Sequence, residues 1–131
     1  METVLYQALT DCESFCWLPG VLAIEVGLGV NENSEVIRQN GWKIERRIDE
    51  GAEYWPVIDD PATRGCLLAL IRKCGFQLAH TRPNEGLWTV WCGDASMVRG
   101  LGNGRTEGEA LARALLEADR LKRQKFRAQA S

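Results

Sequence analysis

The 131-residue sequence contains a single histidine, His80, and it lacks several motifs that would mark an enzyme. It has no Gly-Lys-Ser/Thr segment, which excludes a P-loop. It also lacks the Gly-x-Ser-x-Gly motif of many hydrolases and the His-Glu-x-x-His motif of zinc proteases. Since His80 has no assignable serine, cysteine or aspartate partner, we interpret it as a structural residue. We predict that the protein is not an enzyme and binds no cofactor.

The sequence also lacks an apolar run long enough to cross a membrane. The longest apolar stretch near the start, residues 18–30, is interrupted by Pro19, Glu25 and three glycines. It is shorter than the roughly 20 residues that a spanning helix needs. The first residues carry neither the positive patch nor the small-residue cleavage site of a secretory signal. We therefore expect a cytoplasmic protein with no membrane partner.

The cysteine pattern predicts neither a disulfide framework nor a metal site. The sequence has an odd number of cysteines at irregular spacing: Cys12, Cys16, Cys66, Cys74 and Cys92. The first two could share a helical face, but no second close pair completes a zinc site. No neighbouring residue marks Cys92 as an activated thiolate. We interpret the thiols as small core residues and predict no bound metal.

Composition and charge are those of an ordinary globular domain. Apolar residues make up 45% of the chain and charged residues 26%, and the net charge is −2. This near balance argues against a protein that binds polyanions over its whole surface. We predict a single domain over residues 1–121, followed by a basic extension over residues 122–131 that is helical or frayed.

Hydrophobic periodicity predicts three helices and four strands. The helices are expected at residues 3–16, 61–74 and 106–121, and the strands at residues 21–30, 42–48, 76–82 and 87–93. We expect a polar connector at 31–41 with a helical turn near 35–38, loops at 51–57 and 94–104, and a short edge strand at 97–99. Short strands joined by turns favour antiparallel pairing. The predicted fold class is α+β: an α/β sandwich with a mainly antiparallel sheet, in the order α-β-β-α-β-β-α.

Two of the expected helices begin with recognisable capping residues. Asp60 is a good N-cap, and Pro61 takes the first helical position, where its missing N–H has no cost. We therefore interpret the adjacent carboxylates Asp59 and Asp60 as capping residues rather than as an acid–base pair. Thr106 and Glu109 form a capping box at the start of the last helix.

The strand expected at 87–93 has apolar side chains on both faces. These are Trp88, Val90 and Cys92 on one face, and Leu87, Thr89 and Trp91 on the other. The pattern indicates a strand that is covered on both sides. In the preceding strand we expect His80 to point inward, on the face of Phe76 and Leu78.

A glycine-rich segment at 100–104 precedes the last helix. A glycine turn at a helix N-terminus can hold phosphate. This segment lacks the third small residue of the dinucleotide fingerprint at the required spacing, and no further strand follows it. We therefore expect a flexible loop rather than a phosphate site.

Two groups of residues are candidates for binding another protein. Tyr54 and Trp55 lie in an acidic loop where periodicity does not explain them, and exposed aromatic residues anchor interfaces. The alternative is that Trp55 folds back over the sheet. The second group is the basic stretch that ends the last helix, with Arg120, Lys122, Arg123, Lys125 and Arg127. It could contact a protein or nucleic-acid phosphates, or it could be a solvated helix end.

Three segments carry a resemblance to a known family: residues 59–72, the Trp88-Thr89-Val90-Trp91 strand, and residues 106–116. Over about residues 56–118 the chain resembles the phage ABA sandwich domain of small bacteriophage and prophage proteins. The resemblance implies an α/β sandwich, no established activity and no catalytic residue.

From the residues and the resemblance together we expect a non-enzymatic phage or prophage accessory protein in the bacterial cytoplasm. It would act by binding a host or viral protein, and analogy suggests inhibition of a host defence complex such as a CRISPR effector. The alternative is a nucleic-acid-binding protein that uses the basic C-terminal helix.

Overall fold

The computed structural model describes residues 2–26, 36–39, 43–76, 78–93 and 98–130. These form ten elements in the order α1 (Glu2–Asp11), β1 (Leu22–Glu25), β2 (Val36–Arg38), α2 (Lys43–Asp49), β3 (Tyr54–Pro56), α3 (Pro61–Lys73), β4 (Leu78–Asn84), β5 (Leu87–Gly93), β6 (Val98–Gly104) and α4 (Glu107–Ala130). Of the strand predicted at 21–30, the last four residues lie outside the described part of the chain.

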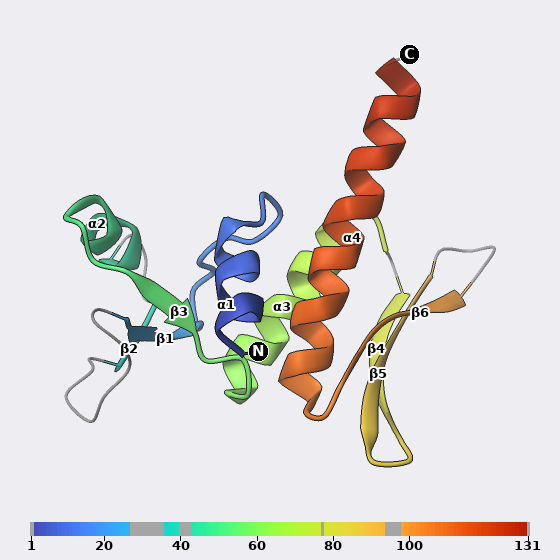
Figure 1. The fold of residues 1–131 in the computed structure, drawn as a ribbon, viewed down its shortest axis with the longest axis horizontal. Coiled ribbons are helices and arrows are strands. Elements are labelled where there is room, and N and C mark those ends of the chain that lie inside the picture. The colour runs from blue at the N-terminus through green and yellow to red at the C-terminus, as the bar shows by residue number, and fades with distance from the viewer. Residues whose placement is uncertain (1, 27–35, 40–42, 77, 94–97, 131) are drawn as a thin grey trace.

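The fold is α+β, with strands paired in antiparallel fashion as predicted. They form two three-stranded sheets rather than one sheet: sheet A, with the order β2-β1-β3, and sheet B, with the order β4-β5-β6. Helices α1, α3 and α4 lie between the two sheets (Figure 1). The main core joins these three helices to the inner face of sheet B.

Helix α3 follows its sequence signals closely. The Asp60 carboxylate accepts a hydrogen bond of 3.0 Å from the Thr63 amide, and Pro61 stands in the first turn. The apolar residues Leu67 and Ile71 are fully buried. Gly75 follows the helix with a φ of +110°, which is a conformation that glycine adopts without strain.

The segment 42–48, predicted as a strand, contains helix α2 instead. Gln39 precedes the helix, and its buried side chain accepts a hydrogen bond of 3.0 Å from the Ile44 amide. This bond satisfies one of the amides that the start of a helix leaves without an intrahelical partner. Ile44 is completely buried in a second, smaller core with Ala23 and Tyr54. Trp42 lies outside the described residues.

Two segments expected to be irregular or helical are strands. Residues 36–38 form β2 rather than a helical turn, and residues 54–56 form β3 within the expected loop. Both pair with β1, whose Ala23 lies opposite Ile37 on one side and Pro56 on the other. These short strands depend on pairing across the sheet, which local periodicity does not reveal.

Polar contacts fasten sheet A to helix α3. The Leu22 amide donates a hydrogen bond of 2.8 Å to Thr63 Oγ1. Arg38 donates two hydrogen bonds of 3.0 Å to the Asp60 carboxylate and one of 2.7 Å to the Gly20 carbonyl. The guanidinium and the helix-start hydrogen bonds hold the pKa of Asp60 at about 2, although partial burial opposes this. The N-cap of α3 is therefore also the anchor of β2.

Strands β4 and β5 form a hairpin, as the alternating runs 76–82 and 87–93 with the turn residues 83–86 between them predict, but the turn is shorter than these four residues. The strands continue to Asn84 and from Leu87, so the turn consists of Glu85 and Gly86 alone. Both have positive φ angles, of 51° and 82°, as a two-residue type I′ turn requires.

The glycine-rich segment forms strand β6 and not a flexible loop. Helix α4 lies directly on its backbone: a Cβ added to Gly102 would stand 2.6 Å from both the Ala110 carbonyl oxygen and the Ala114 nitrogen. A Cβ at Gly104 would stand 2.5 Å from the Ala110 nitrogen. Ala110, Ala114 and Ala118 are fully buried along the facing side of α4. Gly102 and Gly104 therefore allow the backbone of α4 to pack directly against the backbone of β6.

Helix α4 begins as predicted, with the Thr106 hydroxyl accepting a hydrogen bond of 3.1 Å from the Glu109 amide. It runs for 24 residues, so the basic extension is helical to Ala130. None of the helices in the described part of the chain is both long and apolar enough to span a membrane.

Candidate functional site

The predicted aromatic pair does not form an exposed surface. Tyr54 is only 4% exposed, because it packs in the small core with Ala23 and Ile44. The expectation that Tyr54 is an exposed aromatic residue is therefore wrong. Trp55 is half-buried and stacks on Tyr6 of α1, with ring centroids 5.3 Å apart and planes inclined by 11°. Trp55 thus packs back onto the protein, but against helix α1 rather than over the sheet as the alternative had it.

The basic end of α4 divides into paired and unpaired cations. Arg120 forms an ion pair with Glu117, and Arg123 forms one with Asp119. Lys125 is exposed and makes no hydrogen bond or ion pair with a described residue. Of the predicted binding residues, Arg127 belongs to the helix, but its side chain lies outside the described part of the structure.

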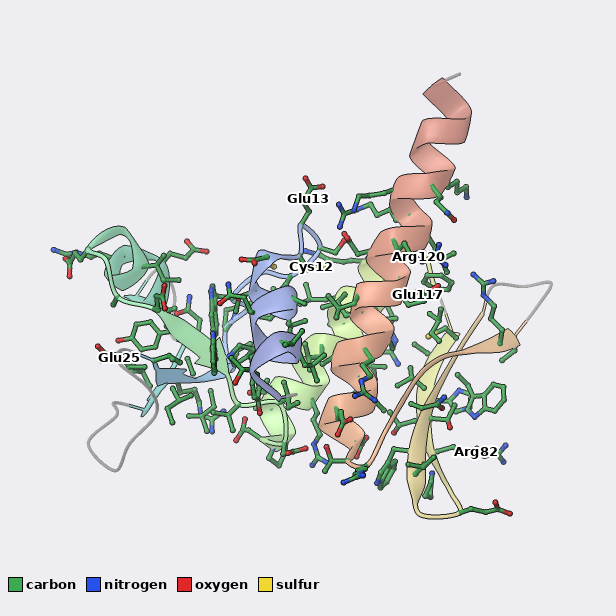
Figure 2. The ribbon with its side chains drawn as sticks, viewed as in Figure 1. Cys12, Glu13, Glu25, Arg82, Glu117 and Arg120 are labelled. Carbon is green, nitrogen blue, oxygen red and sulfur yellow. The ribbon has the colours of Figure 1, made fainter. Side chains whose placement is uncertain are left out.

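The Arg123–Asp119 pair is part of a buried polar cluster between α4 and the turn after α1. Asp119 accepts a hydrogen bond of 2.6 Å from the Ser14 hydroxyl and is only 2% exposed. Burial alone would raise the pKa of Asp119, but the hydrogen bonds from Ser14 and Arg123 and the charge of Arg123 lower it. Burial and the adjacent Asp119 charge raise the pKa of the Cys12 thiol. Figure 2 shows Cys12 between α1 and α4. The cluster fastens two elements together and holds no activated nucleophile.

Cys92 is also unsuited to nucleophilic chemistry. It is completely buried in the core against α4, and burial raises the pKa of its thiol to about 11, with the positive charge of Arg99 opposing the rise. At neutral pH it is a protonated thiol rather than a thiolate. Within the described residues there is also no group of three or more His, Cys, Asp or Glu side chains that could hold a metal ion.

The described helices pack on one face of sheet B and leave the other face uncovered (Figure 1). Val90 and Cys92 of β5 point into the core, so Trp91 between them points to the opposite side. His80 lies opposite Trp91 in β4 and is exposed, which contradicts its predicted inward position. The prediction fails because Ala79, the neighbour of His80, takes the core-facing register. The strand β5 is consequently covered on one side and not on both.

We call this uncovered surface the open face. The pairing register and the burial pattern assign it these side chains: His80, Arg82, Leu87, Thr89, Trp91, Val98 and Asn103. Leu87 is 47% exposed and Val98 is 53% exposed. Figure 2 shows Arg82 on the side of sheet B that is turned away from α4.

The centre of the open face is partly ordered by its own side chains. Thr89 donates a hydrogen bond of 2.9 Å to the amide oxygen of Asn103 across β5 and β6. The Trp91 ring reaches over Gly100, where an added Cβ would stand 3.9 Å from the ring carbon Cζ3. A glycine opposite a tryptophan leaves the ring room to lie toward the neighbouring strand. The open face therefore has a half-buried aromatic centre with apolar side chains and the cationic Arg82 around it.

The alternation of residues 87–93 assigns the two faces of β5 correctly, but the apolar side chains on both faces predict a cover on both sides. The residue pattern alone could not show that sheet B has helices on one side only. A usable signal was nevertheless present, since the three strands of sheet B contain His80, Arg82 and Arg99 but no Asp or Glu.

Comparison with known proteins identifies no relative of this chain. No family model, no curated protein and no solved structure matches it. The resemblance to the phage ABA sandwich domain therefore stays a prediction based on the residues quoted above.

Proposed function

We propose that this protein is not an enzyme and acts by binding a partner protein through the open face of sheet B. The observation that supports this most strongly is the half-buried Trp91 on the face of the sheet turned away from the core, where it lies with exposed Leu87, Val98 and Arg82. Tryptophan and arginine are enriched among the residues that contribute most to protein–protein affinity. Apolar side chains at the same surface supply area that a partner can remove from water.

The charge of the open face indicates the chemistry of the partner. The strands of sheet B contain no acidic residue, while Arg82 and His80 belong to the open face. A complementary surface would have an apolar centre and acidic residues at its rim. Such a rim accelerates association and sets orientation more than it adds affinity.

The biological setting of this proposal comes from the resemblance described above. We propose a phage or prophage accessory protein that acts in the bacterial host cytoplasm. A host defence complex, such as a CRISPR effector, is the partner to test first. Support for this setting consists of the resembling segments, residues 59–72, 88–91 and 106–116.

The experiment is affinity capture from host lysate, followed by binding measurements with the purified partner. We expect Trp91→Ala to weaken binding by at least about 30-fold, the effect of losing about 2 kcal/mol at a central tryptophan. Arg82→Glu should slow association. The matched control is Arg46→Glu, which reverses one exposed charge on α2, away from sheet B.

Partner affinity that is unchanged in both Trp91→Ala and Arg82→Glu would refute the open face as the binding site. An equal loss of partner affinity in Arg46→Glu would also refute the open face, because it would show that any change of surface charge weakens binding. Circular dichroism and thermal melting of each variant verify that the fold is intact.

A further inference from the structure

The C-terminal end of α4 extends past the other elements of the protein (Figure 1). Residues 122–130 add about 13 Å of helix at a rise of 1.5 Å per residue. The described side chains of this end, from Lys122 to Lys125, are all exposed. The end is therefore accessible from several directions.

The buried apolar stripe of α4 ends before residue 122, and lysines continue the same line along the helix. Leu111, Leu115 and Ala118 follow one another at spacings of three or four residues and are at most 1% exposed. Continuing the same helical line leads to Lys122 and Lys125. Lys122 and Lys125 therefore occupy positions at which an apolar residue would need a partner to bury it. As charged residues they can stay in water or bind an opposite charge.

Among the described side chains of this end, the two lysines are the ones that contribute uncompensated charge. Arg120 and Arg123 are paired with Glu117 and Asp119. Lys122 and Lys125 make no hydrogen bond or ion pair with a described residue. The described side chains of this end thus include two positive charges that no described residue neutralises, placed about one helical turn apart.

We propose that this end of α4 binds the phosphate backbone of double-stranded nucleic acid, independently of sequence, through Lys122 and Lys125. Lysine is a compact point charge that binds phosphate well. A helix with its side chains is about 10–12 Å wide and fits the major groove, which is about 12 Å wide.

An acidic protein fits this surface less well. The described side chains after Leu121 are those of Lys122, Arg123, Gln124 and Lys125, and none of these four supplies an apolar centre of the kind that protein interfaces have. Binding to nucleic acid needs no such centre, because counterion release from phosphates supplies most of the affinity. This activity goes beyond the proposed binding of a protein and uses a different surface.

The test measures fluorescence anisotropy of a labelled duplex DNA of about 20 base pairs with the full-length protein, between about 50 and 200 mM salt. We expect binding that weakens steeply with salt. The double variant Lys122→Ala/Lys125→Ala should reduce the slope of log K against log salt by about two, since each phosphate contact contributes about 0.9. Trp91→Ala should leave this binding unchanged, which separates the proposal from the proposed function.

Two matched controls test whether the location of the charge matters. Arg46→Ala/Lys73→Ala removes the same net charge from exposed positions on α2 and α3 and should leave the slope unchanged. Glu117→Ala/Arg120→Ala removes an ion pair at no change in net charge and should also leave it unchanged.

Four outcomes would overturn the proposal. The first three are the absence of duplex binding at the lowest salt, an unchanged slope in the double lysine variant, and an equal loss in the Arg46/Lys73 control. The fourth is equally tight binding of poly-glutamate to the wild-type protein, because it would assign the surface to acidic polypeptides. Circular dichroism verifies the helix content of every variant.

Discussion

Replacing Gly102 with alanine should show how closely α4 lies on strand β6. The added Cβ would stand 2.6 Å from the Ala110 carbonyl oxygen and from the Ala114 nitrogen, whereas ordinary contact begins at 3.4 Å. Both atoms belong to the helix backbone, so no side chain can rotate out of the way. The helix must move away from the sheet by roughly 0.8 Å, which weakens the dispersion contacts of the whole alanine stripe.

The expected cost follows from overpacking, which destabilises well-packed cores by about 1–3 kcal/mol. Replacing glycine also restricts the unfolded chain, which stabilises the protein by about 0.4–1 kcal/mol. Gly100→Ala is the matched control, because its Cβ would meet side-chain atoms at 3.5 Å and 3.9 Å, which is ordinary contact. Both variants restrict the unfolded chain equally, so this effect cancels in the difference between their free energies of unfolding. The difference therefore measures the clash at Gly102, which we expect to cost about 1–3 kcal/mol.

Urea unfolding followed by circular dichroism gives the two free energies of unfolding. In thermal melts, each 1 kcal/mol should lower the Tm by roughly 3–6 °C at this chain length. A Gly102→Ala variant as stable as the Gly100→Ala control would refute the close packing of α4 on β6. Ala114→Gly should not rescue Gly102→Ala, since the clash is with backbone atoms.

Three further predictions concern titrating and reactive groups. The pKa of Asp60 is depressed in the folded state, so its contribution to stability is complete above an unfolded pKa near 4 and is lost as the pH falls toward about 2. Urea unfolding of Asp60→Asn between these pH values should therefore depend less on pH than that of the wild type. Titration of the native protein with a coloured thiol reagent should modify the exposed Cys16 first and the buried Cys92 only on unfolding, and Cys16→Ser should remove the fast phase. Asp119→Ala should lower the free energy of unfolding by about 1.5–3 kcal/mol, because Ser14 loses a hydrogen bond to a charged acceptor, and an unchanged urea midpoint would contradict this.

Sequence reasoning predicted best the elements whose ends are marked locally. Helix α3 has its N-cap, its proline and its closing glycine within one continuous segment, and Thr106 marks the start of α4 in the same way. The β4–β5 hairpin also rests on local signals, namely a turn between two alternating runs. These features need no knowledge of distant residues.

The errors arose where distant residues decide the structure. Ile44 and Ile48 are spaced by four residues, which fits a helix as well as an alternating strand. The helix is favoured by the hydrogen bond that the Ile44 amide donates to Gln39 and by the small core around Ile44. The glycines of 100–104 were interpreted as flexible because their packing partners, the alanines of α4, follow later in the chain. That series of alanines at helical spacing was the available signal.

The candidate sites show the same limit. The sequence predicted unpaired charge at the end of α4, but it could not show that Arg120 and Arg123 are neutralised while the lysines are not. It singled out Trp55, but it could not show that the ring of Tyr6 stacks on Trp55. It assigned the residues of β5 to two faces, but it could not show that the helices pack on the face of Val90 and Cys92 and not on the face of Trp91.

Contact between backbones, with no side chains in between, makes β6 and α4 a stiff unit. Gly102 and Gly104 allow the helix to rest on the strand itself, and only two residues connect the two elements. A rotation of α4 would therefore carry sheet B with it. A nucleic acid held at the far end of the helix and a protein held on the opposite side of the sheet would be kept at a constant spacing and orientation, so the molecule would work as a rigid spacer between them.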